Sequence, residues 1–186
     1  MDPIQIIDKY YSNQIELRNI LLTHSQQVAE RSLRIINNHP ELGIDRQFIY
    51  EAAMLHDIGI FLCDAPNIYC YGTHQYIEHG YLGAELLRKE GLPLHAGVAE
   101  RHTGAGITAD QIEREEYPIP IANYIPLTIE EELICYADKF YSKSRLTETA
   151  TLSKVRYSLW LYGSEAVQRF DRWQQTFEPE LSTEEK

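Results

Sequence analysis

The chain has 186 residues, of which 44% are hydrophobic and 24% are charged, and its formal net charge is −11 at pH 7. This length and composition are typical of one globular domain with a buried core. The acidic balance argues against duplex nucleic acid or an anionic membrane surface as a partner. An anionic substrate would need local positive charge, supplied by a metal ion or by a few placed lysine and arginine side chains.

Nothing in the sequence indicates secretion or a membrane anchor. The three cysteines, Cys63, Cys70 and Cys135, form no C-x-x-C pattern, which favours a reduced protein without a disulfide framework. The first residues lack the basic and apolar regions of a signal peptide, and no apolar run reaches the ~18 residues needed to span a bilayer. We therefore expect a cytoplasmic protein that forms one domain over residues 1–186, with no membrane partner.

The N-terminal part of the chain predicts three helices. Asp2-Pro3 combines an N-cap with a proline at the first helical position, and this helix is expected to end near residue 12. Apolar residues recur with helical spacing from residue 15 to about 37, and His24 falls on that apolar stripe. Asp45 is the expected cap of a third helix, whose apolar row runs from Phe48 into His56.

A loop and two helices are predicted in the middle of the chain. Residues 59–74 are rich in glycine and aromatic side chains, and loops of this kind often wall a ligand site. The aromatic rings could equally well pack the loop onto the domain. Helices are predicted over 75–90 and from 93 to about 103, and their inward sides carry His79 and His102.

The C-terminal part begins with an extended connection over residues 117–126, which contains three prolines. Thr128 and Glu131 form a capping box that opens the next helix, and Asp138 lies on the apolar row of that helix. A carboxylate at such a position is costly unless it is paired or bound to a metal. A final helix is expected over about 151–177, followed by a short acidic tail. The predicted fold class is all-α.

Six polar side chains fall at, or directly beside, inward-facing positions of the predicted helices. They are His24, His56, Asp57, His79, His102 and Asp138. Imidazole and carboxylate donors suit one or two divalent ions, namely Mn, Fe, Co, Ni, Mg or Zn. Two ions bridged by Asp57 would use the whole set and leave room for a bridging hydroxide. His74 and His95 match no such position and are expected at the surface or in loops.

The order of these residues resembles the H…HD…D signature of the HD-domain metal-dependent phosphohydrolases. His56-Asp57-Ile58-Gly59 is the HDIG form of the family's core motif. Residues 78–84, 100–102 and 135–139 are similar to the segments that carry the later ligands in two-metal members. The resemblance covers residues about 15–145 and implies an HD-type helical bundle.

The resemblance also implies two ion sites that share Asp57. One ion would be bound by Asp57 together with His24, His56 and Asp138. The second would be bound by Asp57 together with His79 and His102.

The sequence departs from the family pattern at Ile60, where many two-metal members have lysine, and at Thr103, where some have a second histidine. The Gly-Tyr-Pro segment of the cyclic-di-GMP phosphodiesterases is absent, so we exclude that substrate. Lys139 follows the last ligand at about 100° round the helix and is the predicted phosphate clamp. A solvated charged face would explain Lys139, Lys143 and Arg145 almost as well.

The predicted function is hydrolysis of a phosphomonoester or phosphodiester in a nucleotide-like small molecule by a metal-activated hydroxide. Asp57 and Lys139 are the expected catalytic residues, and Tyr69, Tyr71 and Tyr76 are candidates for stacking on a base. A di-iron oxygenase on the same fold and a non-catalytic nucleotide-binding sensor are the alternatives. A homodimer formed through the C-terminal helix is also compatible with the sequence.

Overall fold

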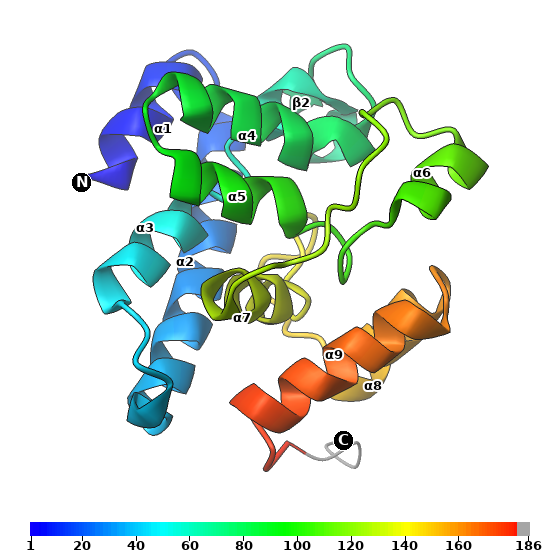
Figure 1. Ribbon diagram of the computed structural model, residues 1–186. Coiled ribbons are helices and arrows are strands. Elements are labelled where there is room, and N and C mark those ends of the chain that lie inside the picture. Colours follow the sequence, from blue (N-terminus) through cyan, green and yellow to red (C-terminus); the bar gives the residue numbers. More distant parts are fainter. Residues whose placement is uncertain (182–186) are drawn as a thin grey trace.

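Helices form most of the structure, a computed structural model that describes residues 1–181 (Figure 1). The α-helices in this range are α1 Pro3–Tyr11, α2 Ile15–Asn38, α3 Arg46–Leu55, α4 His79–Lys89, α5 Pro93–Arg101, α6 Ala109–Glu115, α7 Ile129–Asp138, α8 Leu152–Trp160 and α9 Ser164–Phe177. The described chain also contains strands β1 Asp64–Ala65 and β2 Cys70–Tyr71, and 3-10 helices at Pro40–Leu42, Ile60–Leu62, Pro66–Ile68 and Tyr76–Glu78. The all-α prediction is confirmed.

Side-chain caps start several helices, among them three whose caps are predicted above. Asp2 caps α1, Asp45 caps α3, Thr108 caps α6 and Thr128 caps α7, each by accepting a hydrogen bond from a backbone N–H of the first turn. Such caps satisfy donors that the first turn of a helix leaves unpaired. The predicted starts of α1, α3 and α7 are therefore confirmed.

α2 lies at the centre of the packing. It contacts α1, α3 and α7, and the side chains of its apolar stripe, Leu17, Leu21, Val28 and Ile35, are at most 1% exposed. α4 and α5 lie side by side, and α5 also contacts α3 and α7 (Figure 1). The helices that carry the predicted ligands thus pack around one common core.

Two glycines let the helices that carry the ligands approach each other closely. A Cβ atom on Gly59 would lie 2.3 Å from the carbonyl oxygen of His79, and one on Gly80 would lie 2.7 Å from that of Ala99. Because both neighbours are backbone atoms, any larger residue would push the elements apart. Gly59 therefore sets the distance from the HDIG segment to α4, and Gly80 sets the distance from α4 to α5.

Residues 59–74 are more ordered than a simple loop. β1 and β2 pair antiparallel, with Asp64 opposite Tyr71 and Ala65 opposite Cys70. This small hairpin lies between α3 and α4 in the chain, and the 3-10 turn at Tyr76–Glu78 then leads directly into α4. The segment is therefore a folded wall beside the HDIG motif.

The C-terminal region differs from the predicted single helix over 151–177. Gly163 has a φ of +116°, and the chain forms two helices, α8 and α9, that pack against each other. The prediction was wrong because a φ of this sign ends a right-handed helix and is readily adopted by glycine. Trp173 is buried on α9, whereas Trp160 on α8 is 63% exposed. Of these two tryptophans, Trp160 alone is accessible to a second copy, and the homodimer stays a prediction.

The expected acidic tail falls mostly on residues 182–186, which lie outside the described residues. The three cysteines are free and buried. Within residues 1–181, no helix is both long enough and apolar enough to cross a membrane.

Candidate metal centre

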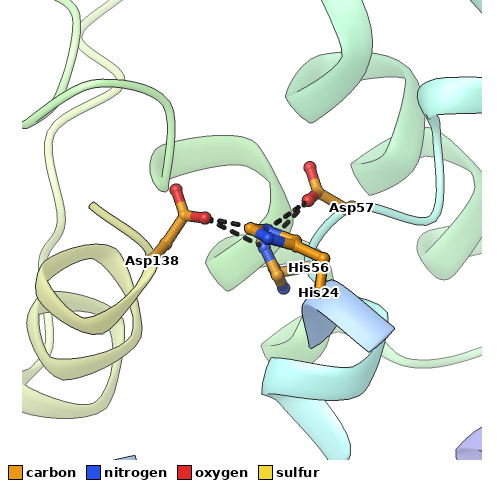
Figure 2. A group of neighbouring side chains, drawn as sticks. All are labelled: His24, His56, Asp57 and Asp138. Atoms are coloured by element: carbon orange, nitrogen blue, oxygen red, sulfur yellow. Dashed lines mark ion pairs between the residues drawn. The ribbon is translucent and has the colours of Figure 1, made fainter. Parts of the chain in front are cut away.

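The predicted ligands meet in the core of the helical domain, although they come from well-separated places in the chain. They are His24 on α2, His56 and Asp57 after α3, His79 at the start of α4, His102 after α5 and Asp138 at the end of α7. Each is at most 8% exposed, and His56 and Asp57 are fully buried. Figure 2 shows the side chains of His24, His56, Asp57 and Asp138 directed toward one another.

Asp57 lies between two groups of histidines. Its Oδ2 atom is 3.2 Å from Nε2 of His24 and 3.0 Å from Nε2 of His56. Its Oδ1 atom is 3.4 Å from Nε2 of His79 and 3.3 Å from Nε2 of His102. One carboxylate therefore offers a different oxygen to each group, as a bridging ligand would.

We refer to Asp57 with His24, His56 and Asp138 as site 1, and to Asp57 with His79 and His102 as site 2. In each site the donor atoms lie within 4.8 Å of one another. Asp138 adds a second carboxylate to site 1, since its Oδ1 atom is 2.9 Å from His24 Nε2 and 3.6 Å from His56 Nε2. These two groups contain the same residues that the resemblance assigns to the two ions, and their role as metal ligands stays a prediction.

The backbone fixes the tautomer of three of these histidines. The Nδ1 atom of His56 lies 2.6 Å from the carbonyl oxygen of Ala53, and the Nδ1 atoms of His79 and His102 lie 2.6 and 2.7 Å from carbonyl oxygens three residues earlier. A carbonyl oxygen only accepts, so each Nδ1 must carry the proton and donate it. In the neutral rings, Nε2 then presents its lone pair to the centre, as metal-binding histidines do.

Several buried polar atoms of the centre have no hydrogen-bond partner among the described residues. They are Nδ1 and Nε2 of His24, Nε2 of His56 and both carboxylate oxygens of Asp57. The short contacts between these residues bring the atoms together without the geometry of hydrogen bonds. One of these oxygens, Oδ2 of Asp57, does form an ion pair with Lys143. Burying the other groups without partners is unfavourable, and a shared cation would satisfy them together.

The spacing in site 2 also fits a divalent ion. Nε2 of His79 and Nε2 of His102 are 3.0 Å apart, and both carry lone pairs when Nδ1 holds the proton. Two nitrogens bound at about 2.1 Å to one ion lie about 3 Å apart when they meet it at a right angle. The residues present therefore fit a divalent metal ion.

The electrostatics of the centre favour positive charge. Burial opposes the ionisation of Asp57, but His56 and Lys143 outweigh it and hold the pKa of this carboxyl well below its ordinary value. Burial also opposes protonation of His56, yet Asp57 and Asp138 raise the pKa of that ring to about 9. In site 2, burial lowers the pKa of His79 to about 3, and His102 acts in the same direction. Protonation is thus favoured at His56 in site 1 and opposed at His79 in site 2.

Lys143 is a residue of the centre that sequence reasoning did not single out. Its Nζ atom lies 2.5 Å from Asp57 Oδ2, and its side chain is 13% exposed. The predicted clamp, Lys139, is also adjacent, with Nζ 2.8 Å from Asp138 Oδ2 and 3.2 Å from the carbonyl oxygen of His102. Arg145 is 67% exposed and is not in contact with the ligands. The only signal for Lys143 in the sequence was its position five residues after Asp138.

A cavity of ≈580 Å³ adjoins the ligands, between residues 64–68 and residues 138–144. Asp138, Lys139 and Lys143 line it, together with Tyr76. The Tyr76 ring stacks on His79, with centroids 4.7 Å apart. Tyr69 and Tyr71, the other predicted stacking residues, do not line this cavity and are 48% and 72% exposed. The cavity gives a substrate access to the centre next to two lysines and two tyrosines, Tyr76 and Tyr141.

His95 was wrongly expected at the surface or in a loop. It lies on α5, is 9% exposed, and its Nε2 atom is 3.3 Å from a carboxylate oxygen of Glu51. Its ring also packs edge-on against Phe48, with centroids 4.9 Å apart. His74 does lie in the loop before α4, where it pairs with Glu78.

Residues 21–142 match the family model of the HD domain, and this segment contains all six candidate ligands. A tRNA (cytidine(56)-2'-O)-methyltransferase from Picrophilus torridus is 31% identical over 129 residues, which are 69% of this chain and 33% of that protein. A protein of the same name from Thermoplasma volcanium is 31% identical over 123 residues, 66% of this chain and 32% of that protein. An uncharacterized protein from Methanocaldococcus jannaschii is 36% identical over 128 residues, 68% of this chain and 67% of that protein.

No solved structure matches the chain. The similarity spans about a third of the length of the two methyltransferases. The family match, by contrast, covers well over half of this chain and includes its HDIG motif. The chain therefore belongs to the HD-domain superfamily of metal-dependent hydrolases.

Proposed function

We propose that this protein is a phosphohydrolase that cleaves a phosphomonoester or phosphodiester of a nucleotide-like molecule, with two divalent ions held at sites 1 and 2. The observation that carries the proposal is Asp57, which presents one oxygen to each group of histidines beside a cavity lined by two lysines. Superfamily membership supports metal-dependent hydrolysis. The phosphate substrate is inferred from the charges around the cavity.

Some side chains of the centre would bind the ions, and others would bind the substrate. If divalent ions are bound there, they would lower the pKa of water toward neutrality and neutralise phosphoryl oxygens. Asp57 keeps the two sites at a fixed separation, and the backbone carbonyls keep the histidine lone pairs directed inward. These contacts preorganise the centre, so little rearrangement is needed when the substrate binds.

Lys139 and Lys143 are the proposed phosphate-binding residues. Both line the cavity and both contact a carboxylate of the centre. In a chain of net charge −11, they place positive charge where an anionic substrate must enter. Lys143 also provides an ammonium group at the centre even though the HDIG motif is followed by Ile60 rather than lysine. Tyr76 is the proposed platform for a base or sugar.

The two lysines also favour hydrolysis over the di-iron oxygenase alternative. Six nitrogen and oxygen donors would hold two irons as well as two redox-inert ions. The cationic side chains beside the centre, however, favour the binding of an anionic substrate such as a phosphate ester. Phosphate release with redox-inert ions would exclude the oxygenase, and substrate-dependent oxygen uptake by iron-loaded protein would exclude the hydrolase.

RNA-derived substrates belong among those to be tested. Two relatives carry the name of a tRNA 2'-O-methyltransferase, and a segment of each resembles this chain. Because the similarity covers only about a third of those proteins, we do not infer methyltransferase activity for this chain. The names nevertheless suggest that a domain of this kind works near RNA, so short oligoribonucleotides join mononucleotides in the panel.

The test is a hydrolysis screen with protein loaded with Mn, Co, Ni or Mg. The substrates are nucleoside monophosphates, nucleoside polyphosphates, cyclic nucleotides and short oligoribonucleotides, and phosphate or nucleotide release is measured. We expect activity that disappears in the His56→Ala/Asp57→Ala variant and survives in His74→Ala, whose ring lies outside both sites. An inactive wild-type protein with a full metal complement contradicts the proposal. Tight nucleotide binding without turnover would instead support the sensor alternative.

A further inference from the structure

The turn between α7 and α8 is held firmly against the core. The N–H of Ala150 donates to the carbonyl oxygen of Phe140 at 2.8 Å and closes the turn. On its far side, Nε2 of Gln27 on α2 donates to the carbonyl oxygen of Leu146 at 2.7 Å. The backbone of the turn is therefore held in a defined position relative to the metal centre.

This turn separates two adjoining cavities. One is the cavity of the metal centre described above. The second has a volume of ≈210 Å³ and is lined by Arg145 from the turn and Lys154 from α8. Lys139, Tyr141 and Ser142 line both cavities. The two cavities therefore adjoin each other at these three residues, and a ligand that extends past them would contact both cavities.

The second cavity is positively charged, although the protein as a whole is acidic. Lys139, Arg145 and Lys154 line it, against a single acidic residue, Glu148. Arg145 Nε and Glu148 Oε2 are 3.7 Å apart and both side chains are more than 60% exposed, so water screens this pair and the guanidinium remains able to bind an anion. No ion pair engages the ammonium group of Lys154 within the described chain. The ammonium group of Lys139 contacts Asp138 at the metal centre, so Arg145 and Lys154 are the cations of this cavity that attract an anion.

We propose that the second cavity binds a second phosphate group of the substrate, while the first phosphate lies at the metal centre. This proposal rests on the proposed function, because it assumes that the first phosphate group binds at the metal centre. Lys139, which lines both cavities, would lie between the two phosphates. Arginine and lysine are the side chains that recognise phosphate oxygens most strongly. The substrate class is therefore a nucleotide with at least two phosphate groups, and not a simple monophosphate.

The test compares AMP, ADP and the dinucleotide pApA by titration calorimetry, using protein loaded with Mn and then freed of excess ion. We expect ADP or pApA to bind about tenfold more tightly than AMP, as one or two charge-assisted contacts would produce. Tighter binding of ADP than of AMP indicates that the second cavity binds the next phosphate of a polyphosphate tail. Tighter binding of pApA than of AMP indicates that it binds the next phosphate of a nucleotide strand. Either result supports the second site.

The Arg145→Gln/Lys154→Gln variant shows whether the second cavity causes the advantage. We expect it to abolish the advantage and to leave the affinity for AMP and the metal content unchanged. The matched control is Lys89→Gln/Arg172→Gln, which removes two exposed cations that line neither cavity and should keep the advantage. Equal affinities for all three nucleotides in the wild type, or an advantage that persists in the first variant, overturn this inference. Hydrolysis of monophosphates under those outcomes would leave the proposed function intact.

Discussion

Sites 1 and 2 share Asp57 but differ in charge. Site 1 combines two histidines with Asp57 and with the second carboxylate of Asp138. Site 2 combines two histidines with the remaining oxygen of Asp57. Divalent ions gain more from two carboxylates than from one, especially in a buried site where charges are poorly screened. We therefore expect site 1 to bind its ion first and more tightly, and site 2 to be the exchangeable site.

Replacement of Asp57 should have the largest effect, because it alone belongs to both sites. Asp57→Asn keeps the shape of the side chain but removes its charge. We expect both ions to be lost and activity to fall on the order of a thousandfold or more. Metal content by plasma mass spectrometry and steady-state rates measure the outcome. Retention of two ions per chain would show that Asp57 does not bridge them.

The asymmetry between the sites predicts different results for two histidine variants. His102→Ala should leave one ion per chain and reduce activity on the order of a hundredfold, since only site 2 is damaged. His24→Ala should weaken site 1 and reduce the total metal content further. Stepwise removal with a chelator provides an independent measure, with one ion expected to leave the wild type first. Equal loss in both variants would refute the proposed order of binding.

Gly59→Ala is expected to disturb site 2 through the backbone. The new Cβ would lie 2.3 Å from the carbonyl oxygen of His79, so α4 must move away from the HDIG segment. We expect a loss of about 1–3 kcal/mol in the free energy of unfolding, with weaker binding of the second ion. Urea denaturation and metal titration measure the two effects. Gly91→Ala is the control for adding a methyl group, because no atom lies within 4 Å of its Cβ position, although its φ of +76° adds backbone strain.

The smallest effect is expected from Lys143, which contacts the site 1 oxygen of Asp57. Lys143→Met should keep the metal content and raise KM for a phosphate substrate about tenfold, through the loss of a charge-assisted contact. Lys143→Arg should restore part of the affinity. Lys139→Met is the companion variant, because its ammonium contacts Asp138 instead. A fall in metal content in Lys143→Met, with KM unchanged, would assign Lys143 to the stability of the centre.

Much of the arrangement of the centre could be predicted from the sequence. His24 and Asp138 each interrupt an apolar helical stripe, and the cost of burying them points to a shared purpose. The capping residues Asp45 and Thr128 place the starts of α3 and α7. The ligands occur at the opposite, C-terminal ends of these two helices. Asp57 lies between the two groups of histidines, and its bridging of two ions stays a prediction.

Three features, Lys143, Gly163 and His95, were harder to predict. Lys143 lies in a turn, where no periodicity indicates which way a side chain points. Its contact with Asp57 depends on how the turn packs against α2. Gly163 was overlooked because the apolar pattern continues on both sides of it. His95 was misplaced because its partner, Glu51, lies on another helix and long-range pairs leave no local signal in one sequence.

The ends of three helices at the centre have an electrostatic consequence. α3, α5 and α7 end at Leu55, Arg101 and Asp138, so their C-terminal ends converge on the ligands. Each helix end carries roughly half a negative charge from its aligned peptide dipoles. This field attracts divalent ions but repels a phosphate. The lysines of the turn after α7 therefore counteract the same backbone field that would help to hold divalent ions.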